Sequence, residues 1–204
     1  MLKKWFKEYI QINEREILTV IGLLITGVIM GVIIYFFVPV TTKQQMLMSA
    51  KEVFEISKSE TYVKTNIIAN GIKTNVLLIG ILAVFSITLF GKWLIYTVVL
   101  LKGTAIAVYT TLLFSIFGPV WGLVTAILLV ILVNILYIPA FIYLTVSFLE
   151  INFNIFKVKL RESEIYLVYK MLLTIFCAFI LMFSSIVIEQ IASSVVLNIY
   201  SNIT

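Results

Sequence analysis

Long stretches without a charged residue constrain the fold of this chain more than any other feature of its sequence. Residues 17–40 form such a stretch, and several more follow. An α-helix rises 1.5 Å per residue, so about 20 apolar residues cross a hydrocarbon core of ~30 Å. Hydrophobic residues make up 62% of the chain and charged residues 12%, against roughly 45–50% and about 25% in soluble domains. We therefore expect an all-α, polytopic membrane helical bundle.

The chain divides into about five predicted transmembrane helices within a single membrane domain, residues 1–204. The predicted spans are 17–40, 75–91, 93–117, 119–148 and 171–188, and the segments outside them are 1–16, 41–74, 149–170 and 189–204. We place the turn between the second and third spans at Gly91-Lys92, with Trp93 at the membrane interface. A turn at Lys102-Gly103 is the alternative.

Two of the polar segments have features of amphipathic helices. Residues 1–16 mix both charge signs with aromatic and aliphatic residues, which is typical of a short helix lying at the headgroups. In residues 41–74, Met46, Ala50, Val53 and Phe54 recur at helical spacing. This second helix either binds something outside the membrane or folds back onto the bundle, and we slightly favour folding back.

The distribution of basic residues predicts the orientation of the bundle. With five spans, residues 1–16, the turn at Lys92 and residues 149–170 lie on one side and carry nine lysines and arginines. The other side carries five, all in residues 41–74. Positive residues are enriched on the cytoplasmic side. We therefore expect a multi-pass plasma membrane protein with its N-terminus in the cytoplasm and its C-terminus outside.

Polar and small residues inside the spans are few. Gly27 and Gly31 form a G-x-x-x-G pattern, which lets a second helix approach closely. Lys102 would lie deep in the third span, where it should face protein, water or a partner. Pro139 should kink the fourth span, and Asn134, one turn earlier, could bond a freed backbone group. Lys102 is open to two interpretations, an anion site or a snorkelling and packing residue, and we favour the second.

The residue types of the chain argue against an enzyme. It has no histidine and no aspartate, and no phosphate-binding loop, C-x-x-C or H-E-x-x-H motif. We therefore expect no catalytic residues, no metal site and no cofactor. The net charge of +5 comes from residues that flank the spans, so we expect contact with anionic membrane lipids rather than nucleic acid.

The order of several short motifs resembles the stage II sporulation protein M family. They are Asn70-Gly71-Ile72-Lys73-Thr74-Asn75 at the entry to the second span, Lys102-Gly103 in the third, and Asn134 followed by Pro139 in the fourth. The first span, with Gly27 and Gly31 after a short charged N-terminus, is also similar. The resemblance covers roughly residues 15–160, and it rests on the order and spacing of the motifs.

This resemblance implies a role in sporulation. Members of the family are non-enzymatic scaffolds in the mother-cell septal membrane of endospore-forming bacteria. They anchor two peptidoglycan hydrolases there, an amidase/endopeptidase and a lytic transglycosylase, during engulfment. Peptidoglycan remodelling at the septum depends on that protein complex.

The resemblance and the predicted topology together suggest where the hydrolases bind. Residues 46–68 are the only substantial polar region on the predicted outer side, so we expect a partner surface there that includes Lys51, Phe54, Lys58 and Lys64. Whether the chain forms a homo-oligomer stays open. The alternative function is a permease- or channel-like subunit of an export system, for which Lys102 would be the discriminating residue.

Overall fold

The computed structural model describes residues 2–56, 60–157 and 164–203. These residues are almost entirely helical, and none of them lies in a strand. The elements are α1 (Leu2–Phe37), α2 (Val40–Ile56), α3 (Glu60–Ser86), α4 (Gly91–Ala126), a π-helical segment (Ile127–Leu132), α5 (Val133–Lys157) and α6 (Glu164–Ile203). The structure thus confirms the predicted all-α helical bundle.

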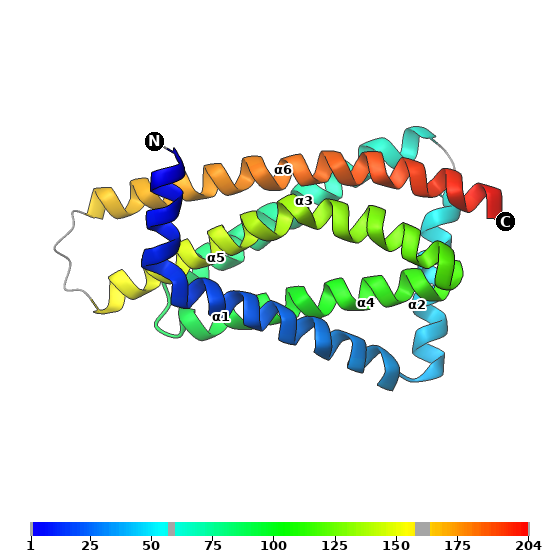
Figure 1. Ribbon diagram of the computed structural model, residues 1–204, viewed down its shortest axis with the longest axis horizontal. Helices are drawn as coiled ribbons and strands as arrows, with labels where there is room; N and C mark the ends of the chain where they lie inside the picture. Colours follow the sequence, from blue (N-terminus) through cyan, green and yellow to red (C-terminus); the bar gives the residue numbers. More distant parts are fainter. Residues whose placement is uncertain (1, 57–59, 158–163, 204) are drawn as a thin grey trace.

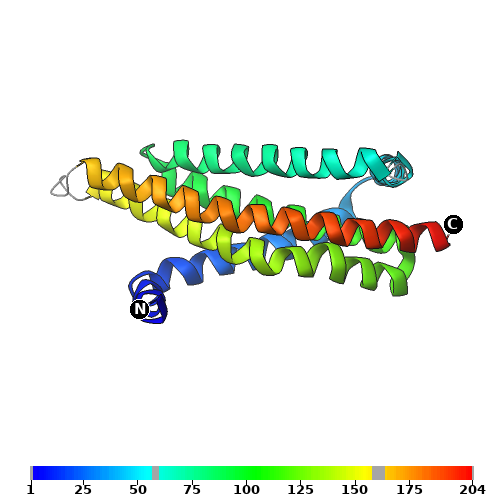
Figure 2. The same cartoon turned by 90° about the horizontal axis from the view of Figure 1, so that it is seen from above.

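The long helices run back and forth along one common direction (Figure 1). Helix α1 runs from the end near the N-terminus to the opposite end, and α3 returns. The chain then passes out along α4, back along α5, and out again along α6, so the two termini lie at opposite ends of the bundle (Figure 1). Figure 2 shows α3 along one edge of this bundle.

A reversal at Gly118 divides the longest helical stretch into two antiparallel arms. Four stretches in the described part of the chain are long and apolar enough to cross a membrane, and one of them, Gly91–Phe153, has 63 residues. A straight helix of that length would measure about 95 Å, roughly three times the hydrocarbon core. Gly118 has φ 74° and ψ −178°, a conformation essentially restricted to glycine, and Pro119 follows it. The stretch therefore folds back on itself and supplies two of the five passes.

The outer faces of the helices are apolar. On α1, the exposed fractions of Leu18, Ile25, Ile29 and Phe37 are 61%, 57%, 55% and 83%. Contiguous exposed apolar surface of this extent is foreign to water-soluble monomers. It suits helices surrounded by lipid, as the sequence predicts.

Two helical segments lie across the bundle rather than along it. Asn13 has φ −107° and ψ 15°, which breaks α1 into a short N-terminal part and a long remainder. The N-terminal part stands across one end of the bundle, and α2 stands across the other (Figure 1). Helix α2 packs against α4, in agreement with the fold-back interpretation of this segment.

Helix boundaries differ from the predicted spans where helices continue into polar sequence. Helix α5 continues past residue 148 to Lys157, and α6 begins at Glu164 and continues past residue 188 to Ile203. The turn between α3 and α4 occupies residues 87–90, next to the predicted Gly91-Lys92, and the alternative site Lys102-Gly103 is helical. Hydropathy marks the lipid-crossing part of a helix, and these helices continue beyond it into polar sequence.

Candidate functional site

The most extensive polar and close-packed contacts join α1 to α4. Three sets of residues make them: Glu16 with Lys92 and Tyr96, Gly27 and Gly31 with Gly103 and its neighbours, and Tyr35 with Ser115. We call these residues the α1–α4 seam. Their order along α1 matches their order along α4, so the two helices run alongside each other through most of the membrane-crossing region.

The middle of the seam is a backbone crossing made possible by glycine. A Cβ atom added to Gly27 would lie 2.3 Å from the Leu100 carbonyl oxygen, and one added to Gly31 would lie 2.5 Å from the Thr104 oxygen. Gly103 is the reciprocal residue, since its Cβ would lie 2.4 Å from the Leu24 oxygen. The predicted close approach of a second helix at the G-x-x-x-G pattern thus occurs, and its partner is the glycine of the Lys-Gly step.

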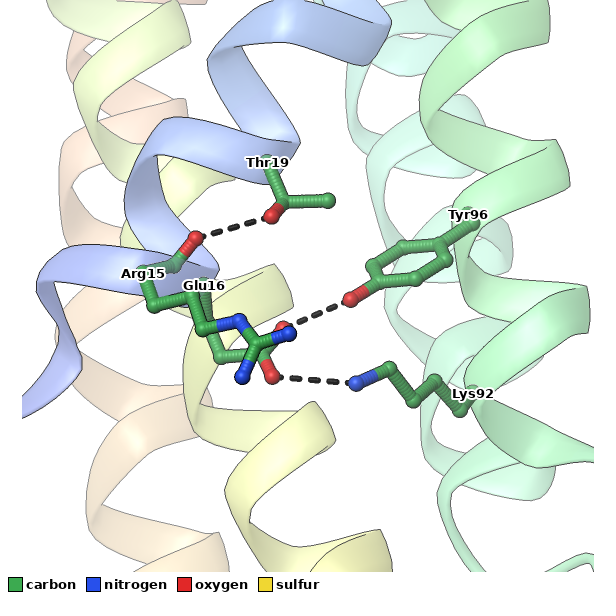
Figure 3. Close-up of polar contacts among 5 residues, drawn as sticks. All are labelled: Arg15, Glu16, Thr19, Lys92 and Tyr96. Carbon is green, nitrogen blue, oxygen red and sulfur yellow. Dashed lines mark hydrogen bonds and ion pairs between the residues drawn. The ribbon is translucent and has the colours of Figure 1, made fainter.

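One end of the seam is a carboxylate clamp (Figure 3). Glu16 Oε1 lies 3.0 Å from Lys92 Nζ, and Tyr96 donates its hydroxyl hydrogen to Glu16 Oε2 at 2.6 Å. Lys92 Nζ also lies 5.5 Å from the centre of the Tyr96 ring. Because Glu16 is the last charged residue before the first apolar stretch, the clamp sits where the bundle meets the membrane surface.

Removing the Glu16 charge should weaken this clamp measurably. In Glu16→Gln, the ion pair with Lys92 is lost and the bond from Tyr96 is no longer charge-assisted. The Lys92 and Glu16 side chains are 51% and 31% exposed, so the loss is modest, roughly 1–2 kcal/mol. Thermal unfolding of the detergent-solubilised protein measures it. Glu14→Gln is the matched control, because Glu14 is exposed, and equal melting temperatures for the two variants would contradict the clamp.

The other end of the seam is a hydroxyl pair. Tyr35 and Ser115 are joined by a hydrogen bond of 2.7 Å between their side-chain oxygens. Lys43, in the first turns of α2, donates to the Phe36 carbonyl oxygen at 3.0 Å and lies over the Tyr35 ring. Lys43 therefore holds the start of α2 against the end of α1, next to the seam residue Tyr35.

Asn152 is a site residue that the sequence analysis missed. It lies on α5, and its Nδ2 donates to the carbonyl oxygens of Ser86 and Thr88 at 2.9 and 2.8 Å. These carbonyls belong to the end of α3 and the turn before α4. A Cβ on Gly91 would meet both Asn152 Nδ2, at 2.6 Å, and the Phe85 oxygen, at 1.9 Å. In the sequence Asn152 stands in the polar segment after the predicted fourth span, and it becomes buried because α5 continues to Lys157.

Lys102 is partly exposed and lies about 16 Å from the start of α4, well inside the membrane-length stretch, as predicted. Its Nζ is 4.4 Å from the centre of the Tyr137 ring, which belongs to α5. Glu189, on α6, interacts electrostatically with Lys102. In the sequence, Glu189 belongs to the segment after the last predicted span. Lys102 thus has aromatic and acidic neighbours from two other helices.

The region of Asn134 and Pro139 departs from α-helical geometry at a π-helical segment before the proline. Asn134 Nδ2 donates to the Val130 carbonyl oxygen at 2.7 Å, at the π-helical segment Ile127–Leu132. Pro139 lies inside α5, about two turns beyond that segment. The departure from α-helical hydrogen bonding therefore precedes the proline, and the Asn134 side-chain amide donates a hydrogen bond to a carbonyl oxygen of that segment.

The remaining predicted residues are spread over other parts of the bundle. Asn75 is buried and Asn70 is exposed, and Gly71 between them packs against Ile186 of α6. On α2, Lys51 is exposed. Lys58 lies outside the described residues, as do the side chains of Phe54 and Lys64.

The arrangement is suited to packing and orientation of helices. Within the described residues, no group of three or more acidic, histidine or cysteine side chains could hold a metal ion. A comparison with protein-family models, curated proteins and solved structures finds no match for this chain. The geometry of the bundle, together with the motif order, is therefore the basis for a functional proposal.

Proposed function

We propose that this chain is a non-enzymatic membrane scaffold that positions peptidoglycan hydrolases at the sporulation septum, as the stage II sporulation protein M family does. It would act in the mother-cell membrane, with the N-terminus in the cytoplasm and the C-terminus outside. Its partners would be an amidase/endopeptidase and a lytic transglycosylase. The observation that carries the proposal is the placement of α2.

Helix α2 has the properties expected of a docking element. It stands across the end of the bundle at which the C-terminus lies (Figure 1), so both face the wall in the predicted orientation. Its exposed residues mix charged, polar and apolar types: Gln44, Gln45, Met46, Met48, Lys51 and Glu52. The exposed fraction of Met48 is 70%. Such a mixed surface is typical of protein interfaces that form and dissociate.

The positions of the motif residues also support a scaffold. Gly27, Gly31 and Gly103 serve a helix crossing, and Asn134 serves a backbone carbonyl. Each of these roles stabilises a fixed arrangement of helices, and a scaffold needs such an arrangement to hold α2 in place. The contacts of Lys43 with the Phe36 carbonyl oxygen and the Tyr35 ring then couple that arrangement to α2.

The test is complementation of a deletion strain of the source organism during sporulation. We expect the deletion to arrest at a flat or bulging septum and the intact gene to restore engulfment. Lys51→Glu should reduce co-purification of the hydrolases by about tenfold, in the range of a charge reversal at an interface. Lys51→Arg is the matched control and should retain them. Normal engulfment in the deletion strain would refute the proposal.

The second candidate is a permease- or channel-like subunit, which is favoured by Lys102 and Glu189 because both lie within membrane-length apolar stretches. Intramembrane ionisable residues commonly mark transport paths. The same strain separates the two candidates. If the protein is a scaffold, the Lys102→Met variant should support engulfment whenever it accumulates to the normal level. If it is a transport subunit, the same variant should fail to support engulfment even at that level.

A further inference from the structure

The turn that joins α3 to α4 carries four large apolar side chains that point away from the bundle. Ile87, Leu89, Phe90 and Trp93 are 58%, 70%, 69% and 73% exposed. We call these four residues the apolar turn cluster. Turns between helices are usually rich in polar residues, glycine and proline, because they lie in water. A group of exposed apolar side chains on a turn therefore marks a surface that contacts something other than water.

The turn binds several of its polar backbone atoms within the protein. The Thr88 N–H donates to the Phe85 oxygen at 3.1 Å, and the Thr88 hydroxyl donates to the same oxygen at 2.9 Å. The Thr88 oxygen accepts from the Gly91 N–H at 3.0 Å. The Asn152 side-chain amide donates to the Ser86 and Thr88 oxygens. Since backbone that enters a membrane must satisfy its polar groups within the protein, these bonds suit a turn that is withdrawn from water.

The Glu16 clamp indicates the depth of the turn in the membrane. Lys92 directly precedes Trp93 of the cluster, and its Nζ pairs with Glu16, the last charged residue before the first apolar stretch. The turn therefore lies at the level where that stretch enters the membrane. Helix α5 continues to Lys157, and Figure 1 and Figure 2 show α5 and α6 extending beyond the turn. The turn is thus set back from the end of the bundle, at the boundary between headgroups and acyl chains.

The surface next to the apolar turn cluster identifies lipid as its partner. On α3, Val84 lies one turn before Ile87 and is exposed. On α4, Leu94 follows Trp93 and is also exposed. The cluster therefore adjoins the apolar outer faces of both helices, and tryptophan is enriched at the membrane boundary.

We propose that the α3–α4 turn is a membrane anchor that lies within one leaflet, with the apolar turn cluster in contact with lipid rather than with water or a protein. In the predicted orientation this is the cytoplasmic leaflet. The anchor is independent of the scaffold function. It requires only that the turn enters the headgroup and acyl boundary, as the apolar faces of interfacial helices do.

Cysteine reactivity tests whether water reaches the turn. The natural cysteine is removed by Cys177→Ser, and Leu89→Cys is compared with Glu14→Cys in open membrane fragments, where a charged methanethiosulfonate reagent reaches both faces. Both positions are exposed and close to the clamp in the sequence, but only Glu14 is charged. The reagent reacts with thiolate, which forms poorly in apolar surroundings. We expect Leu89→Cys to react at least about tenfold more slowly than Glu14→Cys, and equal rates would overturn the proposal.

A second measurement distinguishes lipid from a protein partner and needs no cysteine. Trp5→Phe and Trp121→Phe leave Trp93 as the only tryptophan. After reconstitution in vesicles, its fluorescence should be lost when the lipid carries bromine in its acyl chains. Acrylamide in the water should quench it much less than it quenches free tryptophan in the same vesicles. Quenching by acrylamide alone would place the turn in water, and quenching by neither would place it against protein, so either result would refute the anchor.

Discussion

Gly27→Ala should destabilise the bundle strongly, although it adds only one methyl group. That methyl would lie 2.3 Å from the Leu100 carbonyl oxygen and 3.1 Å from the Gly103 Cα atom. Both are backbone atoms, so no side chain can turn aside and the two helices must separate. Overpacking of this kind costs about 1–3 kcal/mol, and separation also loses contacts along the seam. A drop of several degrees in the melting temperature of the detergent-solubilised protein measures the effect.

Gly22→Ala is the matched control for this prediction. Gly22 lies on the same helix, and a Cβ there meets nothing within 4 Å. Alanine favours a helix over glycine by up to about 1 kcal/mol, so this variant should be neutral or slightly more stable. Gly103→Ala should match Gly27→Ala, since its methyl would lie 2.4 Å from the Leu24 oxygen. Equal stability of Gly22→Ala and Gly27→Ala would contradict the crossing.

Asn152→Leu should open the turn between α3 and α4. The substitution keeps a side chain of similar size but removes the two hydrogen bonds to the Ser86 and Thr88 oxygens. The buried Ser86 carbonyl left without its donor costs about 1–3 kcal/mol, whereas the part-buried Thr88 oxygen keeps its hydrogen bond from the Gly91 N–H. Asn152 is itself 7% exposed, so water replaces the lost donor poorly. We expect a loss of roughly 1–3 kcal/mol in stability, with faster amide hydrogen exchange in residues 86–91.

The control for Asn152 makes the same chemical change at an exposed position. Asn70→Leu replaces an amide on the exposed side of α3 and should leave both stability and exchange in residues 86–91 unchanged. Asn152→Asp gives a further check. A carboxylate facing two carbonyl oxygens is repelled by them, so this variant should be at least as unstable as Asn152→Leu. Unchanged exchange in either Asn152 variant would refute the proposed role.

The G-x-x-x-G pattern of Gly27 and Gly31 predicts a close helix contact but not the helix that makes it. The spacing of Gly27 and Gly31 puts both on one helix face, so a close helix contact could be predicted from that face alone. The identity of the partner could not, because Gly103 and Leu100 are separated from them by two other helices in the chain. The Glu16 clamp also depends on the fold. Its partners Lys92 and Tyr96 are 76 and 80 residues away in the sequence, and only assembly of the helices brings them together.

Lys102 and Glu189 differ in how well their positions could be predicted from the sequence. The depth of Lys102 follows from its position in a long apolar stretch, and so does its need for a neighbour. Glu189, by contrast, borders the last apolar stretch, and hydropathy assigned it to the exterior. The structure instead continues α6 to Ile203, so Glu189 lies inside a helix that packs against α5 and α3, and its side chain is only partly exposed.

The sequence alone determined that this protein is an all-α helical bundle of about five apolar helices. Uncharged stretches of membrane length cannot leave their backbone unpaired in lipid, so helices are the only solution that a single such segment can satisfy by itself. The tertiary structure decided which faces meet: the α1–α4 seam, the hydrogen bonds of Asn152 to the Ser86 and Thr88 oxygens, and the contact of Lys102 with Tyr137. Those contacts join residues far apart in the chain, and their energies depend on distances of a few tenths of an ångström, which no periodicity along one helix encodes.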